Sequence, residues 1–427
     1  MVEKSATMQD RVLLRGVRVF DGEDFLPQLQ DVRVTGGVIE SLTATEASAA
    51  DADSPAGSGA DAASSDLEVI DAYGHTLTPG IIDCHVHVCF SDAGSLTSFT
   101  EPFSLQFYKS VVHLQRTLCA GVTTARDAGG ADAGVRHALQ AGLISGPDLR
   151  LAISIMSQTG GHGDGQMLSG CSMPMLTSHP GRPDGVADGP EGVLRKVREI
   201  LRAGADQIKI CSTGGVLSPT DDPRHSQFTE EEIAVIVSEA HAQGSYVMSH
   251  AQGTEGIKNA LRAGVRSIEH GIYLDDESIE MMLEAGAFLV PTLQAPMSVI
   301  AAADAGAPLP PAVVDKARRV AETHAASIAA AYEAGVQIAM GTDAGVGEHG
   351  QNLEEIELMI ANGMAPVDAL ASATSVAARL LDDENIGRIA PGRTADLVLF
   401  DTDLREGGAE KIRQHTIGVW QAGRRVR

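Results

Sequence analysis

Two histidines separated by a single residue occur early in the chain, in the run IIDCHVH at residues 81–87. Alternate side chains of a strand point to the same face, so His85 and His87 would project together if this run is extended. Neutral imidazole is a common ligand of zinc and similar divalent ions, and the pair could therefore supply half of a metal site. Such a pair also occurs by chance or in ordinary core packing, so further ligands must be identified.

Further candidate ligands follow apolar runs later in the chain. His250 closes SYVMSH, His270 closes RSIEH, and Asp343 follows IAMGT. If these runs are strands of repeated βα units, each residue lies at the strand end where the active sites of (β/α)8 barrels are built. One strand-end histidine alone would be explained as a hydrogen-bonded core residue. Four histidines and an aspartate at equivalent positions predict a metal centre.

A lysine, Lys209, stands inside the apolar run QIKIC at residues 207–211. A free ammonium group in such a strand would lose its hydration at a large cost in free energy. The amine must therefore be paired, neutral or chemically modified. An ion pair with a buried carboxylate and a role in the metal centre are both compatible with this position.

The elements that must position these side chains are alternating strands and helices. From Thr78 onward, short apolar runs are each followed by a helical period, which is typical of repeated βα units around a parallel sheet. Clear helical periods cover Glu230–Gln243 and Gly256–Ala263. The predicted strands are Ile81–His87, Val122–Arg126, Leu149–Ile155, Gln207–Cys211, Tyr246–His250, Ser267–His270, Phe288–Pro291 and Gln337–Gly341. The fold class is therefore expected to be α/β, a (β/α)8 TIM barrel.

The two ends of the chain show a different pattern. Residues 12–42 contain short β-rich runs broken by Gly and Asp, and residues 387–401 and 416–426 return to short strands. Each part is too small to bury a core alone, so we expect them to pair. The prediction is a discontinuous β-sandwich formed by residues 1–77 and 385–427, beside a catalytic barrel over 78–384.

Together these motifs resemble the amidohydrolase superfamily. The resemblance rests on TPGIIDCHVH, the strand-end Lys209, the pair His250 and His270, GTDAG around Asp343 and the tail APGRTADLVLFD, and it covers nearly the whole chain. The runs SQTGGHGD, IKICSTGGVLSP and SIEHGIYLDD are similar to the imidazolonepropionase-like branch. That branch includes Xaa-Pro and other dipeptidases, N-acyl amino acid hydrolases and ochratoxin-type amide hydrolases.

The resemblance implies a site with two divalent cations, usually zinc. His85, His87 and Asp343 would hold one metal and His250 and His270 the other. Lys209 would carry carbon dioxide as a carbamate whose two oxygens bridge the metals. Such a centre lowers the pKa of a bound water and presents hydroxide to the scissile carbonyl, while Asp343 accepts a proton and returns it to the leaving amine.

A second catalytic candidate is His162, in the glycine-rich loop GGHGD at residues 160–164. Glycines there allow a substrate to approach the backbone closely. The alternative interpretation is that His162 is an ordinary loop histidine without a catalytic role. By resemblance, His162 donates a hydrogen bond to the substrate carbonyl or to the developing oxyanion.

Substrate contacts are less constrained by the sequence. Gln252 follows His250 where dipeptidases of this branch often carry tyrosine, and its amide can still donate to a carbonyl or a carboxylate. Arg224 and His225, in SPTDDPRHSQF, are candidates to bind a free carboxylate, although a surface position is the ordinary explanation for such an arginine. Tyr273 would either line the pocket or pack in the core.

Three functions compete at this point. The first is a binuclear hydrolase that cleaves the amide bond of a dipeptide or an N-acyl amino acid. The second is a cyclic amide or imine hydrolase, or a deaminase, of the imidazolonepropionase kind. The third is a catalytically silent scaffold. Mononuclear members of the superfamily generally lack the bridging lysine, so Lys209 favours the first, and the complete ligand set argues against the third.

Composition excludes some partners and compartments. The 57 acidic residues against 32 Lys and Arg give a formal net charge of −25, which disfavours nucleic acid and anionic lipid. The five cysteines suggest neither a disulfide framework nor a thiolate zinc site. No apolar run is long enough for a membrane span, and the N-terminus lacks the apolar core of a signal peptide. We expect a cytoplasmic enzyme with a small-molecule substrate, assembled as a homo-oligomer.

Overall fold

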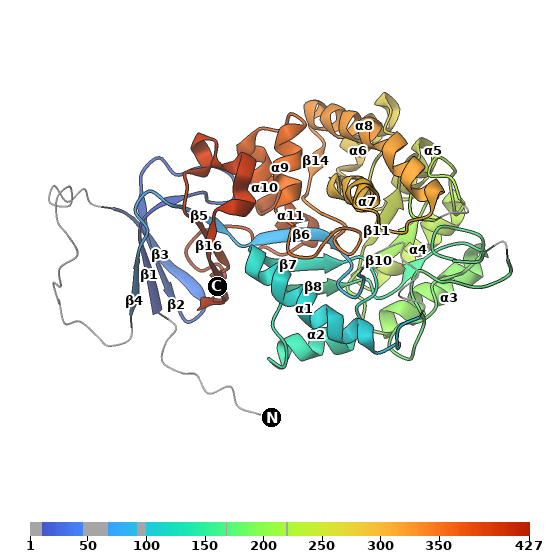
Figure 1. Cartoon of the computed structure of the whole chain (residues 1–427), viewed down its shortest axis with the longest axis horizontal. Helices are drawn as coiled ribbons and strands as arrows, with labels where there is room; N and C mark the ends of the chain where they lie inside the picture. The colour runs from blue at the N-terminus through green and yellow to red at the C-terminus, as the bar shows by residue number, and fades with distance from the viewer. Residues whose placement is uncertain (1–10, 46–66, 92–99, 168, 219–220) are drawn as a thin grey trace.

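The structure, a computed structural model of the whole chain, describes residues 11–45, 67–91, 100–167, 169–218 and 221–427. It has two parts, which Figure 1 shows side by side. The terminal sheet contains strands from both ends of the chain, and the parallel-sheet region contains the strands and helices between them.

In the parallel-sheet region, short strands and helices alternate along most of the chain. The strands are β6 (Ile81–Val86), β7 (Val122–Asp127), β8 (Asp148–Leu151), β9 (Ile155–Met156), β10 (Ile208–Cys211), β11 (Val247–Ala251), β12 (Ser267–His270), β13 (Phe288–Val290) and β14 (Gln337–Ile338). The helices are α1 (Leu105–Ala120), α2 (Ala133–Gln140), α3 (Gly189–Arg202), α4 (Glu230–Ala242), α5 (Thr254–Arg262), α6 (Asp276–Ala285), α7 (Gln294–Asp304), α8 (Pro311–Ala334), α9 (Glu354–Ala361), α10 (Pro366–Ser372) and α11 (Ser375–Leu381). The predicted α/β class is confirmed.

Neighbouring strands of this region pair in parallel, in the order β6-β7-β8 in one sheet and β9-β10-β11-β12-β13-β14 in the other. The predicted third strand is split into β8 and β9, because Ile153 between them has a positive φ of 66°. Backbone hydrogen bonds from Cys84 to Met340 (2.9 Å) and from His87 to Ala344 (2.8 Å) join β6 to the segment that follows β14. The last parallel strand thus leads back to the first.

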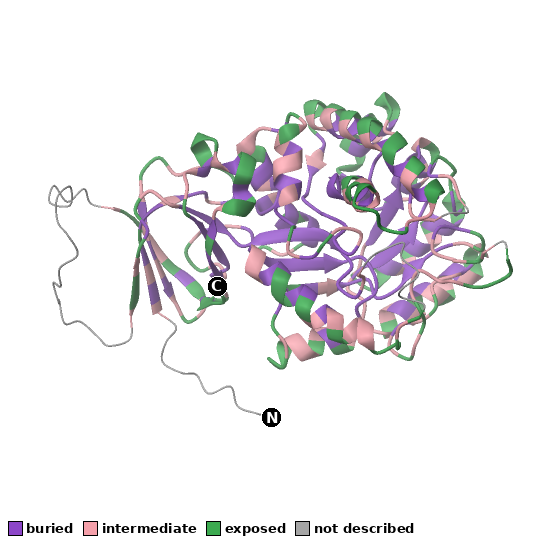
Figure 2. Ribbon diagram, viewed as in Figure 1, coloured by how far each residue is buried: buried purple, intermediate pink, exposed green. Residues whose placement is uncertain are grey.

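The burial of these elements follows from their sequences. All residues of β6, β7, β10 and β11 are buried, as expected for parallel strands covered on both faces (Figure 2). Helix α3 buries Val193, Val197 and Ile200, whose spacing of four and three residues places them on one helical face. Helix α4 begins with a capping box, in which Thr229 and Glu232 each accept a backbone hydrogen bond from the other.

The terminal sheet is a single hydrogen-bonded sheet of mixed direction. Its strands are β1 (Arg11–Val19), β2 (Gln30–Thr35), β3 (Val38–Ala44), β4 (Glu68–Asp71), β5 (Thr76–Pro79), β15 (Leu397–Phe400), β16 (Thr416–Gln421) and β17 (Arg424–Arg425). The short 3₁₀ helices η2 (Leu404–Glu406) and η3 (Gly408–Gln414) lie between β15 and β16. The strands of the terminal sheet lie in the order β17-β16-β15-β5-β1-β2-β3, with β4 beside β1. Strands from the two ends of the chain therefore share one sheet.

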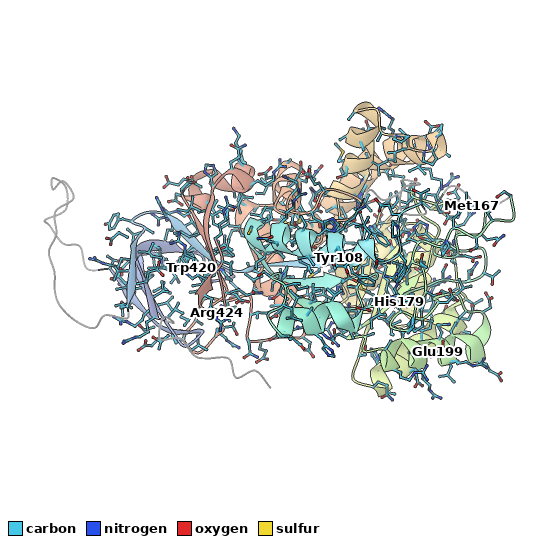
Figure 3. All side chains as sticks on the ribbon, turned by 60° about the horizontal axis from the view of Figure 1, so that its bottom comes forward. Tyr108, Met167, His179, Glu199, Trp420 and Arg424 are labelled. Atoms are coloured by element: carbon cyan, nitrogen blue, oxygen red, sulfur yellow. The ribbon has the colours of Figure 1, made fainter. Side chains whose placement is uncertain are left out.

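The terminal sheet has its own core and a direct connection to the parallel strands. Trp420 in β16, labelled in Figure 3, is buried in that core with Leu77 and Leu397. Only Gly80 separates β5 from β6, and a Cβ there would collide with the Thr123 side chain. The strand that carries His85 thus continues from the terminal sheet.

Within the described ranges, no helix combines the length and the apolar composition needed to cross a lipid bilayer.

Candidate metal centre

The six predicted metal ligands all line one pocket. They come from the ends of separate strands or from the residues directly after them, and every one is buried. We call this set the ligand cluster: His85, His87, Lys209, His250, His270 and Asp343. The structure therefore brings together residues that lie up to 258 positions apart in the sequence.

Three members of the ligand cluster are close enough to share one ion. One potential donor atom from each of His85, His87 and Asp343 lies within 4.8 Å of the others. Asp343 Oδ1 is 3.6 Å from His85 Nε2 and 3.4 Å from His87 Nε2. Two imidazoles and one carboxylate form a donor set that suits zinc and similar divalent cations.

Lys209 reaches the same place from β10, with its Nζ atom 3.4 Å from His85 Nε2. Burial lowers the pKa of Lys209, although the charge of Glu269 acts in the opposite direction. A lowered pKa favours the neutral amine, which is the nucleophilic form of lysine. The position and the electrostatics of this side chain fit the predicted carbamate.

His85 is held by a buried ionic network. Its Nδ1 atom lies 2.7 Å from Glu269 Oε2, which leaves Nε2 facing Asp343. Glu269 is also bound by Arg126 at 2.9 Å and by Ser267, and the Arg126 and Glu269 side chains are fully buried. A carboxylate on the far nitrogen fixes the orientation of a metal-binding histidine and increases its basicity.

The other imidazoles are anchored in the same manner. His87 Nδ1 lies 2.7 Å from the Gly129 carbonyl oxygen, and His270 Nδ1 lies 2.7 Å from Thr292 Oγ1. His250 uses Nε2, which is 3.1 Å from a carbonyl oxygen, that of Gly214. Each ring thus keeps one nitrogen for the pocket, as a metal ligand must. The residues present therefore fit a metal centre.

Burial also sets the protonation of these rings. It holds the pKa values of His85, His250 and His270 well below their usual range and lowers that of His87 to about 4. The neutral imidazole is therefore favoured near pH 7, and that form binds metals.

Asp343 occupies a strained position in this pocket. Its φ is 59°, and its backbone N–H donates to the His85 carbonyl oxygen at 2.7 Å. His270 and Thr292, which also line the pocket, have positive φ values of 75° and 53°. Such conformations cost about 1 to 3 kcal/mol each and tend to occur at functional sites. Burial raises the pKa of Asp343 to about 6, although nearby Lys209 opposes this rise.

His162 lies beside the ligand cluster, where its ring stacks on His250 with a centroid distance of 4.4 Å. Its Nδ1 donates to Asp221 Oδ2 at 3.0 Å. Burial favours a higher pKa for Asp221, but the hydrogen bond from His162 and the charge of Lys316 hold that pKa below its usual value. A Cβ at Gly215 would collide with the His162 ring, so this ring needs the glycine. The contact with Asp221 engages Nδ1, so Nε2 can donate to a substrate when both ring nitrogens are protonated.

Beyond the ligand cluster and His162, the lining is largely apolar, with Gln252, Thr292 and His324 as polar members. Seven apolar side chains come from the segments after β10, β12 and β14 and from α7, and we call them the pocket wall: Val216, Leu217, Ile272, Ala295, Pro296, Val299 and Val346. Gln252 also lines the pocket, and its backbone N–H donates to Thr213 Oγ1 at 2.9 Å. Apolar walls with few polar groups are typical of small-molecule sites.

Three predicted substrate residues are not among the described residues that line the pocket. The Arg224 guanidinium pairs with Asp222 at 2.7 Å, and its side chain is 66% exposed. His225 is exposed, and the Tyr273 ring packs against the apolar cluster that contains Ile272. The structure therefore does not bring these three side chains into the pocket with Gln252.

Sequence reasoning missed the residues that orient the ligands. Glu269 directly precedes His270 in an apolar strand, and the argument used for Lys209 would have identified it. Thr292 and Asp221 stand in loops and gave no comparable signal. Their contacts appear only when the chain is folded.

Comparison with known proteins finds amidohydrolases by family model and by sequence. The model of the amidohydrolase family matches residues 76–426. Ochratoxinase from Aspergillus niger is 33% identical over an alignment of 369 residues, which covers 82% of this chain and 75% of that protein.

Two solved structures are also similar over nearly the full length. A prolidase in complex with N-methylphosphonate-L-proline is 36% identical, with a TM-score of 0.84 and coverage of 97% of this chain and 99% of the other. A Xaa-Pro dipeptidase with bound methionine is 32% identical, with the same TM-score and coverage. These matches confirm the predicted resemblance, including its branch.

Proposed function

Because the chain belongs to the amidohydrolase family, we propose that it hydrolyses an amide bond in a small peptide-like molecule. Dipeptides and N-acyl amino acids are the first substrates to test. The observation that carries this proposal is the convergence of the free imidazole nitrogens, the Lys209 amine and the Asp343 carboxylate in one pocket. The prolidase, dipeptidase and ochratoxinase relatives support an amide substrate.

The proposed cofactor is a pair of zinc ions. His85, His87 and Asp343 would hold one ion and His250 and His270 the other, with carboxylated Lys209 between them. When bound, such cations activate water and polarise a carbonyl group.

Side chains of the pocket carry out the proton transfer and stabilise the carbonyl oxygen. Asp343 accepts a proton from the attacking water and delivers it to the leaving nitrogen, which requires a carboxylate close to both atoms. His162 donates a hydrogen bond to the carbonyl oxygen, whose negative charge increases as the tetrahedral intermediate forms. With the ring as the imidazolium, Nδ1 donates to Asp221, which orients the ring, and Nε2 donates to the substrate. The Asp343 and His162 side chains are both buried, and the lower dielectric around them strengthens both interactions.

We also propose that the two parallel sheets close into one (β/α)8 barrel and that the terminal sheet forms the predicted β-sandwich. The hydrogen bonds from β6 to the segment after β14 support the closure. The predicted boundaries at residues 77 and 385, the homo-oligomer and the cytoplasmic location stay predictions.

The test uses the full chain loaded with zinc and bicarbonate. We expect about two zinc ions per chain and hydrolysis of at least one class in a panel of dipeptides, N-acyl amino acids and lactones. His87→Asn should lose metal and activity, whereas His241→Asn, at an exposed histidine of α4, should retain both. A protein that binds no metal under these conditions would contradict the proposal.

The second candidate activity, hydrolysis of a cyclic amide or imine, is tested by adding such compounds to the panel. Lys209, 3.4 Å from His85, favours the binuclear amide hydrolase.

A further inference from the structure

Helix α8 lies beside α7 (Figure 1) and contacts segments that follow two strands of the ligand cluster. Its buried residues Val313, Ala317 and Val320 recur every three or four positions, so they lie on one helical face. This face packs in one apolar cluster with Val216, which follows β10, and with Ile272, which follows β12. The helix is therefore placed against the chain where it leaves two of the ligand-bearing strands.

Polar residues of α8 bind the main chain of the same segments. Ser327 Oγ donates to the Ile272 carbonyl oxygen at 2.7 Å, and His324 Nε2 donates to the His270 carbonyl oxygen at 2.9 Å. Lys316 stands eight residues before His324, which is about two helical turns, so the two side chains leave the same side of α8. Lys316 is thus directed toward the strand ends as well.

The Lys316 ammonium group is buried and binds the segment that follows β10. Its Nζ atom donates to the carbonyl oxygens of Gly215 at 3.0 Å, Ser218 at 2.7 Å and Asp221 at 2.5 Å. The Asp221 Oδ1 atom lies 3.5 Å from the same nitrogen. An ammonium group has three donors and loses its hydration when buried, so these acceptors offset a large cost in free energy.

Two of the residues that Lys316 binds also contact the His162 ring. Asp221 Oδ2 accepts from His162 Nδ1 at 3.0 Å and from the Gly215 N–H at 3.2 Å. A Cβ at Gly215 would lie 2.3 Å from His162 Cε1, so the ring lies directly against this glycine. Lys316 therefore connects α8 to both groups that surround the ring.

The charge of Lys316 also acts on the Asp221 carboxyl group. Burial favours a higher pKa for Asp221, but the hydrogen bond from His162 and the charges of His162 and Lys316 hold that pKa below its usual value. Asp221 is therefore a carboxylate near pH 7. A carboxylate only accepts hydrogen bonds, so it keeps Nδ1 of His162 as a donor.

We propose that Lys316 is a positioning residue of this pocket, whose ammonium group holds Gly215 and Asp221 where they orient His162 toward the substrate carbonyl. The proposal rests on the proposed amide hydrolysis and on the role of His162 in it. Lys316 is not among the described residues that line the pocket, so it acts through the residues that it holds.

The first test measures steady-state constants of Lys316→Met in the zinc-loaded full chain, with the best substrate of the panel. A misaligned His162 stabilises the oxyanion less, so we expect kcat to fall about 10- to 100-fold. Val216 keeps its apolar contacts with α8, and KM should change less than about threefold. Bound zinc should stay unchanged, because the hydrogen bonds of Lys316 go to Gly215, Ser218 and Asp221 rather than to the ligand cluster.

Lys258 provides a matched control on another helix, α5. It is also buried, and it pairs with Asp275 at 2.8 Å and with Glu277 at 2.5 Å. None of these three residues belongs to the described lining of the pocket. Lys258→Met removes the same charge and should leave kcat and KM unchanged, even if the Tm falls in both variants. A similar fall in kcat in both would indicate a general loss of structure and overturn the proposal.

A double-mutant cycle examines whether Lys316 acts through His162. If it does, Lys316→Met should lower kcat little further in a chain that already carries His162→Ala. Two losses that multiply in the double variant would assign Lys316 a separate effect and overturn the proposal.

Amide hydrogen exchange gives a readout that does not need turnover. We expect faster exchange at residues 213–218 and 221–228 in Lys316→Met than in Lys258→Met. Equal exchange in the two variants would overturn the positioning role. If the unmodified chain hydrolyses no compound of the panel, the proposed function fails, and the exchange comparison decides the positioning role by itself.

A second substitution covers the case in which Lys316→Met does not fold. Lys316→Arg keeps the charge, but its planar guanidinium does not match the acceptors that surround the compact ammonium group. It should lower kcat in the same direction and by a smaller factor. An unchanged kcat in Lys316→Arg together with unchanged exchange would then overturn the proposal.

Discussion

The ligand cluster and the pocket wall line the same pocket but are built differently. In the ligand cluster, His85, His87 and His270 each have their Nδ1 atom within 2.7 Å of a partner that orients the ring. In the pocket wall the side chains are apolar, and the oxygen of neighbouring Gln252 has no hydrogen-bond partner in the described part of the chain. The rings of the ligand cluster are therefore oriented before a substrate binds. The Gln252 oxygen can gain a hydrogen-bond donor from a bound molecule. Reaction chemistry and substrate choice therefore depend on separate parts of the pocket.

The largest expected effect follows from Asp343→Asn, because an amide cannot accept the proton of the attacking water. We expect kcat to fall by about three orders of magnitude while the fold is retained. Asp382→Asn is a matched control, since Asp382 is exposed and has a similar φ of 56°. Steady-state assays and thermal unfolding of both variants provide the measurement. Substantial residual turnover in Asp343→Asn would remove Asp343 from its proposed role.

Glu269→Ala tests whether the ligand cluster depends on its orienting partners. It leaves the buried Arg126 without its counter-charge, and we expect a loss of about 3 to 5 kcal/mol in unfolding free energy. Zinc affinity should fall about 10- to 100-fold, measured by competition with a chelator. Glu269→Gln keeps an acceptor for His85 and should lose less affinity. Equal affinities in the two variants would contradict an orienting role.

The pKa of Asp343 predicts a pH dependence for the metal-free protein. Burial raises this pKa from 3.8 to about 6, so between these values the folded protein holds a proton that the unfolded chain has released. Stability is therefore lost as pH rises from about 4 to 6, by up to about 3 kcal/mol. Urea unfolding after chelation should show Asp343→Asn gaining stability over the unmodified protein across this range. If the free energies of unfolding of the two proteins changed equally with pH, the prediction would be contradicted.

The smallest effect concerns the pocket wall. Leu217→Ala removes apolar contact with a hydrophobic substrate, so KM should rise about tenfold with little change in kcat or bound zinc. Leu283→Ala, at a leucine of α6 that is 45% exposed, should change neither constant. A fall in bound zinc in Leu217→Ala would mean that the two regions are not separate.

The sequence was most informative about the ligand cluster. His250 and His270 each stand in or at the end of a short apolar strand, and such a pattern can be recognised from local sequence alone. The strand Ser267–His270 has its predicted bounds, whereas Leu149–Ile155 is interrupted at Ile153, whose positive φ no propensity indicates. Propensity rules describe average preferences, and strained residues depart from them.

The surroundings of the pocket were harder to predict. Arg224 turns outward because Asp222, two residues away, binds its guanidinium, and its charge alone did not reveal that pairing. Thr292 orients His270 from a segment 22 residues later in the chain. Both outcomes depend on how loops pack after the strands have formed.

The short connection through Gly80 has a consequence for synthesis on the ribosome. Strand β5 pairs with β1 on one side and with β15 on the other, and β6 with its two histidines follows directly. A growing chain can pair β1 with β2, and β2 with β3, early, but it cannot cover the other edge of β5 until residues 397–400 have emerged. The strand that carries His85 thus follows a strand whose second neighbour is synthesised more than 300 residues later.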